Sequence, residues 1–312
     1  MKRENRNITH IFIVNPYAGR LTFAADLRKK LSEIKYIKYF VFNTRYPGHE
    51  QELVKEILGM FENERLRFYC CGGSGTMRNI LNGFENLSDV EIAFFPCGLT
   101  NDFLKMFGSD AKRFWDIEEL INGEVLDVDY IKSSRGVLLN TFSTGLDAAL
   151  IAKTDEHRML RVFHPSLPYA IGGLYAMLVS RRQAYEVELE GKKVNGRVTE
   201  IFFGNGGIFG GNLPLAKCAD VMDGKADYRI IPDCSIFTIV TKILPILKGK
   251  DNKLDEISDY GRSKSITVRR IDGKPFLANQ DGEADITREW TGLVVHKGLH
   301  FVVPKGVRPN GR

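Results

Sequence analysis

The feature that most limits the fold of this chain is an apolar run that passes directly into a glycine-rich turn. Leu66–Cys71 is typical of a buried strand, and Gly72-Gly73-Ser74-Gly75-Thr76 follows at once. A helical pattern resumes at Met77–Phe84. Glycines let the backbone fold so that successive N–H groups point at one spot, and the helix that follows adds the positive end of its dipole. This order predicts a phosphate-binding loop that needs no lysine. An ordinary tight turn stays an alternative, because the loop has neither the dinucleotide nor the Walker spacing.

The remainder of the first third repeats the alternation of strand and helix. Further strands are expected at residues 10–14, 37–42 and 90–95, with helices at 21–34 and 48–61 and a short helix from Asn101. Strands that alternate with helices indicate a parallel, doubly wound sheet with helices on both faces.

The pattern changes to mostly strand-like runs near Leu126. Turn signals such as Glu190-Gly191 and Asp272-Gly273 separate these runs. Strands are expected at 137–142, 185–189, 198–203, 226–231 and 265–270, helices at 170–181 and 235–247, and a strand pair at 293–303. We therefore expect a nucleotide-binding α/β domain at 1–130, completed by the tail 291–312. A β-rich, sandwich-like domain is expected at 131–290.

Composition excludes several classes of protein and site. The five cysteines include no C-x-x-C pair and the six histidines no H-x-x-x-H pair, which argues against a disulfide framework and a zinc site. A net charge of +5 is too small for a dense basic face, so no nucleic-acid partner is expected. The N-terminal segment lacks the apolar core of a signal peptide, and no apolar run reaches the roughly 18 residues that a spanning helix needs. We expect a cytoplasmic protein that is at most peripheral at the membrane.

Six segments, in order along nearly the whole chain, resemble the diacylglycerol kinase catalytic domain family. This family includes bacterial diacylglycerol kinases and the related lipid and sphingosine kinases. The segments are Asn15-Pro16-Tyr17-Ala18-Gly19, Gly72–Thr76, Pro96–Phe103, Asn140–Ala148, Asn205–Asp227 and Asp281-Gly282-Glu283. Each is weak by itself, but six in sequence are specific. The resemblance implies an α/β domain of the NAD-kinase and diacylglycerol-kinase type, a second sandwich-like domain that holds the lipid, and ATP in the cleft between them.

The resemblance also implies roles for individual residues. The nucleotide site would comprise Asn15, Thr44, Gly72, Gly73, Ser74, Gly75, Thr76, Asn101 and Asp102, with the loop amides and the Thr76 hydroxyl on the phosphates. Asp281 would be the general base that takes the proton from a lipid hydroxyl, with Glu283 beside it. Mg²⁺ would bridge the β- and γ-phosphates. A second, structural Mg²⁺ would bind the Asp223 side chain and backbone oxygens of Asp220 and Lys225.

The sequence departs from the family pattern close to the expected phosphates. Ser74 stands where the family has an aspartate, Arg78-Asn79 replaces an Asn-Glu pair, and Leu99 replaces a threonine. Asp102 and Asp127 remain from the acidic, metal-binding network. Two interpretations follow: an active kinase in which Arg78 neutralises phosphate charge, or a family member that binds nucleotide or lipid without full catalysis.

The sequence favours an ATP-dependent lipid kinase, with diacylglycerol or a related lipid as substrate and phospholipid biosynthesis as context. Peripheral membrane contact is expected, and a homodimer is left open. Two further functions stay open, namely a soluble-substrate kinase related to NAD kinase and a nucleotide-free interaction protein. The second-domain motifs favour the lipid branch over NAD kinase. The sequence does not identify the lipid.

Overall fold

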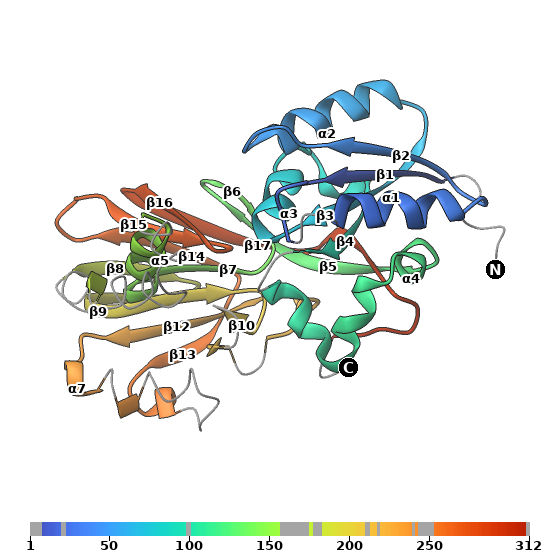
Figure 1. Cartoon of the computed structure of the whole chain (residues 1–312). Helices are drawn as coiled ribbons and strands as arrows, with labels where there is room; N and C mark the ends of the chain where they lie inside the picture. Colours follow the sequence, from blue (N-terminus) through green and yellow to red (C-terminus); the bar gives the residue numbers. More distant parts are fainter. Residues whose placement is uncertain are drawn as a thin grey trace. The chain divides into compact units, whose positions relative to one another are not determined.

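The computed structural model describes residues 8–19, 23–97, 101–156, 175–176, 183–209, 213–216, 219–238, 241–242 and 253–309. The chain forms two compact units (Figure 1). The first holds the residues up to Asp129 and those from His296 onward, and the second holds Tyr130–Val295. Two strands have residues in both units: β5 (Glu124–Ser133) and β17 (Glu289–Val303).

The first unit is built on a parallel sheet. Its strands are β1 (Ile8–Val14), β2 (Lys38–Asn43), β3 (Arg65–Gly72), β4 (Glu91–Pro96) and the C-terminal part of β17, in the order β2-β1-β3-β4-β17. The helices are α1 (Phe23–Glu33), α2 (His49–Met60), α3 (Ser74–Leu81) and α4 (Ile117–Ile121), with 3-10 helices η1 (Leu87–Asp89) and η2 (Asp102–Trp115). The prediction of a doubly wound α/β domain is confirmed.

Helices cover both faces of this sheet, which explains its sequence. β1 and β4 are buried along their whole length and are accordingly almost continuously apolar. The chain moves from β1 to β2 in one direction along the sheet and from β2 to β3 in the other, so right-handed crossovers place α1 and α2 on opposite faces. Figure 1 shows α1 and α2 on opposite sides of β1 and β2. The direction reverses between β1 and β3, which is the usual ligand position in such sheets.

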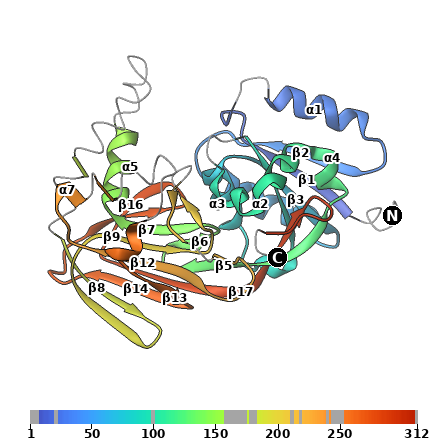
Figure 2. The same ribbon diagram turned by 90° about the horizontal axis from the view of Figure 1, so that it is seen from below.

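The second unit consists mainly of antiparallel strands. They are β6 (Gly136–Leu138), β7 (Thr141–Gly145), β8 (Ala184–Leu189), β9 (Lys192–Gly204), β12 (Ala226–Pro232), β13 (Asp259–Ser263), β14 (Ser265–Arg270), β15 (Phe276–Gln280) and β16 (Glu283–Thr287), with the short pair β10 (Ile208–Phe209) and β11 (Leu213–Pro214). Helical segments are α5 (Leu146–Glu156), α7 (Ile236–Thr238) and η7 (Lys253–Glu256). Figure 2 shows α5 beside β7 and β16.

The long strand β9 links two groups of strands in this unit. Its first half pairs with β8, which continues to β14 and the start of β17. Its second half pairs with β7 and β12. Alternate side chains of β9 serve different cores: Ile201 and Phe203 pack in the main core around Trp290, whereas Phe202 packs with Leu254 in a smaller cluster. The predicted β-rich second domain is confirmed.

Several expected elements differ in the structure. α3 begins at Ser74 rather than Met77, because the glycine loop itself forms the first helical turn. The expected strand pair at 293–303 is wrong: β17 is one strand, which pairs antiparallel with β14 and then parallel with β4. The hairpin of β15 and β16 was not predicted. The helices expected at 170–181 and 235–247 fall mostly outside the described residues.

Candidate functional site

The N-terminus of α3 is the first part of the candidate site. Gly73 is extended (φ −101°, ψ −172°), and the helix begins at Ser74. The first helical hydrogen bond runs from the Met77 N–H to the Gly73 carbonyl at 3.0 Å. The N–H groups of Ser74, Gly75 and Thr76 precede that bond, and no side chain in the described part of the chain caps them. Three amides at the positive end of the helix therefore point to an anion site.

Thr76 ties this turn to the loop after β1. Its Oγ1 accepts a hydrogen bond from Asn15 Nδ2 at 3.0 Å, and the residue is buried. A Cβ added to Gly72 would lie 2.6 Å from the Thr76 side chain, so position 72 requires glycine. The predicted residues Asn15, Gly72 and Thr76 thus form one packed group, in which Thr76 has a structural role.

The ends of four parallel strands meet at this edge. The Asn15 N–H donates to the Cys71 carbonyl at 3.0 Å, and the Thr44 N–H donates to the Val14 carbonyl at 2.9 Å. The Cys97 N–H donates to the Gly72 carbonyl at 2.8 Å. These bonds join the loops after β1, β2, β3 and β4 at the carboxyl edge, where the strand order reverses. The sequence placed Asn15 and Thr44 near one ligand, and the structure places both at this edge.

Asn101 and Asp102 follow β4 at the start of η2. Asn101 is buried and adopts a left-handed conformation (φ 43°, ψ 48°). The Asp102 carboxylate pairs with Lys105 Nζ at 2.8 Å. Asp127, the other acid retained from the family pattern, bonds His300 Nδ1 at 2.6 Å. Among the described residues, no group of three or more histidine, cysteine or acidic side chains could hold a metal.

The positions that depart from the family pattern lie around α3. Ser74 is the first residue of the helix, and Asn79 donates weakly to Glu50 of α2, at 3.4 Å. Arg78 lies on the same helix, and its carbonyl accepts from Asn82. Gly98, Leu99 and Thr100 lie outside the described residues.

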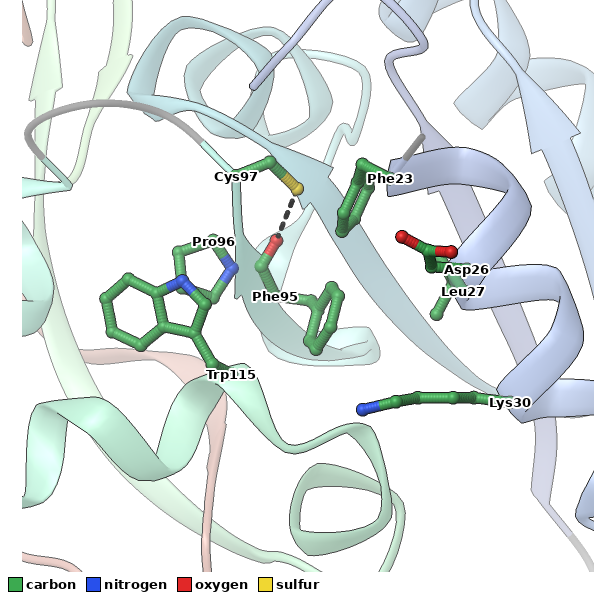
Figure 3. A pocket seen from close by; sticks show the side chains of 8 residues that line it. All are labelled: Phe23, Asp26, Leu27, Lys30, Phe95, Pro96, Cys97 and Trp115. Atoms are coloured by element: carbon green, nitrogen blue, oxygen red, sulfur yellow. Dashed lines mark hydrogen bonds between the residues drawn. The ribbon is translucent and has the colours of Figure 1, made fainter. Parts of the chain in front are cut away.

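A cavity of about 430 Å³ lies between α1, the end of β4 and η2 (Figure 3). Phe23 of α1 stacks on Phe95 of β4 at 5.5 Å, and Trp115 comes from η2. Burial raises the pKa of the Cys97 thiol to about 12, so it stays protonated and is a poor nucleophile. Right-handed crossovers place α1 and α3 on opposite faces of the sheet. We therefore assign no part of the phosphate site to this cavity.

The Asp281-Gly282 dipeptide forms the two-residue turn between β15 and β16. Both residues have positive φ, 51° and 93°, as in the turn type that favours Asp-Gly. The Asp281 carboxylate accepts three backbone hydrogen bonds, from Leu139 at 2.9 Å, Asn140 at 3.1 Å and Thr141 at 2.7 Å. Glu283 is exposed beside it. The turn therefore holds Asp281 in a fixed orientation, which the sequence did not predict.

A buried polar network lies directly behind this turn. Asp147 accepts hydrogen bonds from Asn279 Nδ2, at 2.9 Å, and from the Ser143 hydroxyl. The Asp147 N–H donates to Glu200 Oε2 at 3.0 Å. Burial raises the pKa of Asp147 to about 6, and burial together with Asp147 raises the pKa of Glu200 well above its usual value. Sequence analysis gave these residues no role, although Ser143 and Asp147 lie in one of the matching motifs.

The residues expected to hold a structural Mg²⁺ have other partners. The Asp223 carboxylate forms an ion pair with Arg262 and accepts the Lys225 N–H at 3.0 Å. Asp220 Oδ1 accepts the Met222 N–H at 3.0 Å. A guanidinium already supplies the positive charge at Asp223, and a second cation there would be repelled. In the structure the guanidinium of Arg262 therefore lies where a metal would bind the Asp223 carboxylate, and the predicted backbone ligands at Asp220 and Lys225 stay a prediction. The sequence gave no signal for Arg262, which is distant in the chain.

Comparisons with known proteins agree with both units. The sequence matches the diacylglycerol kinase catalytic domain over residues 9–133 and the YegS C-terminal NAD kinase beta sandwich-like domain over residues 140–300. A diacylglycerol kinase of Bacillus subtilis (strain 168) is 24% identical over 300 residues, which cover 94% of this chain and 95% of the relative. YtlR of the same organism, whose name assigns it provisionally to the lipid kinases, is 26% identical over 294 residues, which cover 87% and 92%.

A solved structure shows the same fold. The crystal structure of a diacylglycerol kinase from Bacillus anthracis str. Sterne aligns with a TM-score of 0.66 at 16% identity. The alignment covers 94% of this chain and 96% of that chain. The order of an α/β unit and a β-rich unit is therefore shared along almost the full length of both proteins.

Proposed function

The chain belongs to the diacylglycerol kinase family, and on that premise we propose that it is an ATP-dependent lipid kinase. The reaction transfers the γ-phosphoryl group of ATP to a lipid hydroxyl. The observation that carries this proposal is the N-terminus of α3, whose first three amides have no side-chain cap within the described residues. It lies at the edge where the strand order of the first unit reverses.

In the proposed complex the triphosphate lies on the amides of Ser74, Gly75 and Thr76. Asn15 and Thr44 border the same edge through the backbone bonds of their loops, and Asn101 and Asp102 border it from the start of η2. The Thr76 hydroxyl keeps its own hydrogen for donation, since it uses a lone pair for Asn15. The amides and the helix dipole stabilise negative charge that grows on the phosphoryl oxygens during transfer.

The proposed base is Asp281. The lipid oxygen forms a bond to the γ-phosphorus, the bond between that phosphorus and the bridging oxygen of ADP breaks, and the hydroxyl proton passes to the carboxylate. Three backbone amides donate to the Asp281 carboxylate, and in the proposed complex the lipid hydroxyl donates to one of the same two oxygens, since a carboxylate oxygen can accept more than one hydrogen bond. Because these amides fix the carboxylate, little reorganisation is needed in the transition state. Glu283 is the exposed acid next to it.

Mg²⁺ is proposed as the partner of ATP, where it would neutralise charge on the β- and γ-phosphates. It would keep several waters and take few protein ligands, as this ion usually does with nucleotides. Asp102 is the retained acid nearest in sequence to the loop after β4, and it is buried against Lys105.

The proposed substrate is diacylglycerol or a related hydroxylated lipid, the class named for the B. subtilis relative. Such a lipid resides in a bilayer, so we propose peripheral contact with the membrane from the cytoplasmic side. No helix among the described residues is long and apolar enough to cross a bilayer.

A lipid-panel assay tests this function. The purified chain is incubated with radiolabelled ATP, Mg²⁺ and mixed micelles that each contain one hydroxylated lipid, including diacylglycerol and a sphingoid base. Transfer of label to at least one lipid is expected. ATP binding without label transfer to any lipid would remove the kinase assignment, and absence of ATP binding would remove the nucleotide site as well.

The specific observation behind a second candidate function is Ser74, which leaves the first helical position without the family's carboxylate. The second candidate is a nucleotide- or lipid-binding protein with impaired catalysis. Ser74→Asp distinguishes the two, because aspartate suits the first turn of a helix and restores the missing charge. An active kinase should change turnover by less than about threefold, whereas an impaired one should gain about a hundredfold, within the range of a single acid-base group.

A further inference from the structure

Asn279 lies where the hairpin that carries Asp281 meets the buried acids of the second unit. Its Nδ2 donates to Asp147 Oδ2 at 2.9 Å and to Ser143 Oγ at 3.1 Å. Its Oδ1 accepts from the Gly282 N–H at 3.1 Å. Both ends of the amide are engaged, so the network itself determines its orientation, with the donor toward the acid and the acceptor toward the turn.

Burial makes these contacts energetically important. Asn279 and Ser143 have no exposed surface. A hydrogen bond lost there leaves a buried polar group without a partner, which typically costs about 1–3 kcal/mol. The network is also anchored on the opposite side, because the Asp147 N–H at the start of α5 donates to Glu200 of β9.

Two hydrogen bonds hold the turn that carries Asp281. Asp281 has a φ of 51°, a left-handed conformation that aspartate adopts more readily than most non-glycine residues and that this type of hairpin turn requires. In the first hydrogen bond the Asp281 N–H donates to the Thr141 carbonyl at 2.9 Å. In the second the Gly282 N–H donates to the Asn279 side chain. Asn279 therefore fixes the far side of the turn from which the Asp281 carboxylate projects.

Acidic groups lie around Asp147, so the contact between residues 147 and 279 depends on a hydrogen-bond donor at position 279. Glu200 of β9 faces Asp147, and its pKa is raised by burial and by that neighbour. β16, which packs on α5, carries the exposed acids Glu283 and Asp285, and Asp285 pairs with Arg135. On α5 itself, Lys153 lies over the Tyr175 ring. Of the polar side chains that touch Asp147, Asn279 and Ser143 are the donors.

We infer that Asn279 is a positioning residue, which couples the Asp147 carboxyl to the Gly282 amide and so aims the proposed base Asp281. This inference rests on the proposed kinase function. It assigns Asn279 no contact with ATP or lipid, so its substitution should lower kcat and leave the KM for ATP unchanged.

Charge exchange between positions 147 and 279 tests the inference. Asn279→Asp replaces an N–H donor with a carboxylate oxygen that faces Asp147 Oδ2. The double variant Asp147→Asn/Asn279→Asp restores one donor and one acceptor with their positions exchanged, and the second oxygen at position 279 still accepts from Gly282. Asn195→Asp, on an exposed residue of β9, is the matched control for the same chemical change.

Asn279→Asp should reduce kcat at least about tenfold at pH 8, since one lost buried hydrogen bond to a charged group is worth about that much. Lowering the pH to 6 should recover most of this loss, because two facing acids then share a proton. The double variant should lie within about threefold of the wild type at pH 8. The KM for ATP should stay unchanged throughout, and the control should match the wild type.

Thermal unfolding gives a second readout that needs no turnover. The Tm deficit of Asn279→Asp relative to the wild type should shrink as the pH falls from 8 to 6. A deficit independent of pH, or full kcat of Asn279→Asp at pH 8, contradicts the inference. So does a double variant that folds like the wild type but recovers no activity. If the wild type phosphorylates no lipid, the kinase proposal fails by itself, and the pH dependence of Tm still decides whether the coupling exists.

Discussion

The glycine turn of the first unit and the Asp-Gly turn of the second unit differ in whether groups of the chain itself satisfy their hydrogen bonds. At the start of α3, three consecutive amides have no side-chain cap within the described residues. At Asp281-Gly282, both backbone amides and both carboxylate oxygens have partners within the chain. The first arrangement suits a site that receives an anion, because the ligand completes the hydrogen bonding. The second suits a group that must keep one orientation while a substrate approaches.

The two turns also differ in how a substitution would affect them. At the α3 turn the proposed phosphate contacts come from the backbone, so serine in place of aspartate at position 74 leaves the amides intact. At the Asp281 turn the proposed role belongs to a side chain that is tied to Leu139, Asn140 and Thr141. Any change of that side chain alters both the chemistry and the local fold.

The largest expected effect comes from Asp281→Asn. The variant loses the proposed base and turns an amide donor toward backbone N–H groups, so we expect kcat to fall at least about a hundredfold. The Tm should fall as well, because buried donors lose their acceptor. Asp285→Asn, an exposed change on the same hairpin, is the control and should keep wild-type turnover. If Asp281→Asn turned over substrate at nearly the rate of the control, the Asp281-Gly282 turn would have a purely structural role.

The next largest effect is expected from removing one of the three amides at the start of α3. Proline is well tolerated at the first position of a helix, and Gly73 already has the extended conformation that precedes proline. Ser74→Pro therefore removes one N–H while the helix persists. ATP affinity, measured by calorimetric titration, should fall about tenfold to a hundredfold, as expected for a hydrogen bond to a charged group. Ser74→Ala keeps the amide and should lose much less. Equal losses in the two variants would assign the effect to the hydroxyl.

In the buried polar network around Asp147, we expect Glu200→Gln to change the stability of the protein in a pH-dependent way. Burial raises the pKa of Glu200 above its unfolded value, so the wild type loses stability as the pH rises beyond about 4.5. Glutamine does not titrate and escapes this loss. The Tm of the variant relative to the wild type should therefore increase as the pH rises from 4 through the raised pKa of Glu200, by a few degrees. A constant difference over that range would mean that Glu200 is charged in the folded protein.

The smallest expected effect concerns Arg262. Its ion pair with Asp223 is partly exposed, so Arg262→Ala should lower Tm by no more than about 3 °C. Removal of the guanidinium frees Asp223 for a cation, so millimolar Mg²⁺ should recover part of the loss in the variant. A chelator should leave the wild-type Tm unchanged. If the chelator lowered the wild-type Tm as much as the mutation does, the result would support the structural magnesium site predicted at this turn.

The sequence predicted the first unit well because its signals are local. Val14, Cys71 and Pro96 each end an apolar run that is buried in a parallel sheet, and Gly72 marks the turn that Thr76 packs against. The family pattern added Asp281 and Glu283, which periodicity alone leaves as a common turn.

The second unit was less predictable because its important contacts join distant parts of the chain. Asn279 meets Ser143 and Asp147 more than 130 positions away, and Arg262 meets Asp223 across two strands. No spacing within either segment signals these pairs. The single strand β17 was missed for the same reason, since its two halves have different partners.

The anion site at the start of α3 can be tested by a structure of the protein with a non-hydrolysable ATP analogue and Mg²⁺. We expect phosphate oxygens within hydrogen-bond distance of the Ser74, Gly75 and Thr76 amides. A triphosphate bound elsewhere, or those three amides bonded to the chain's own carbonyls in the complex, would contradict it.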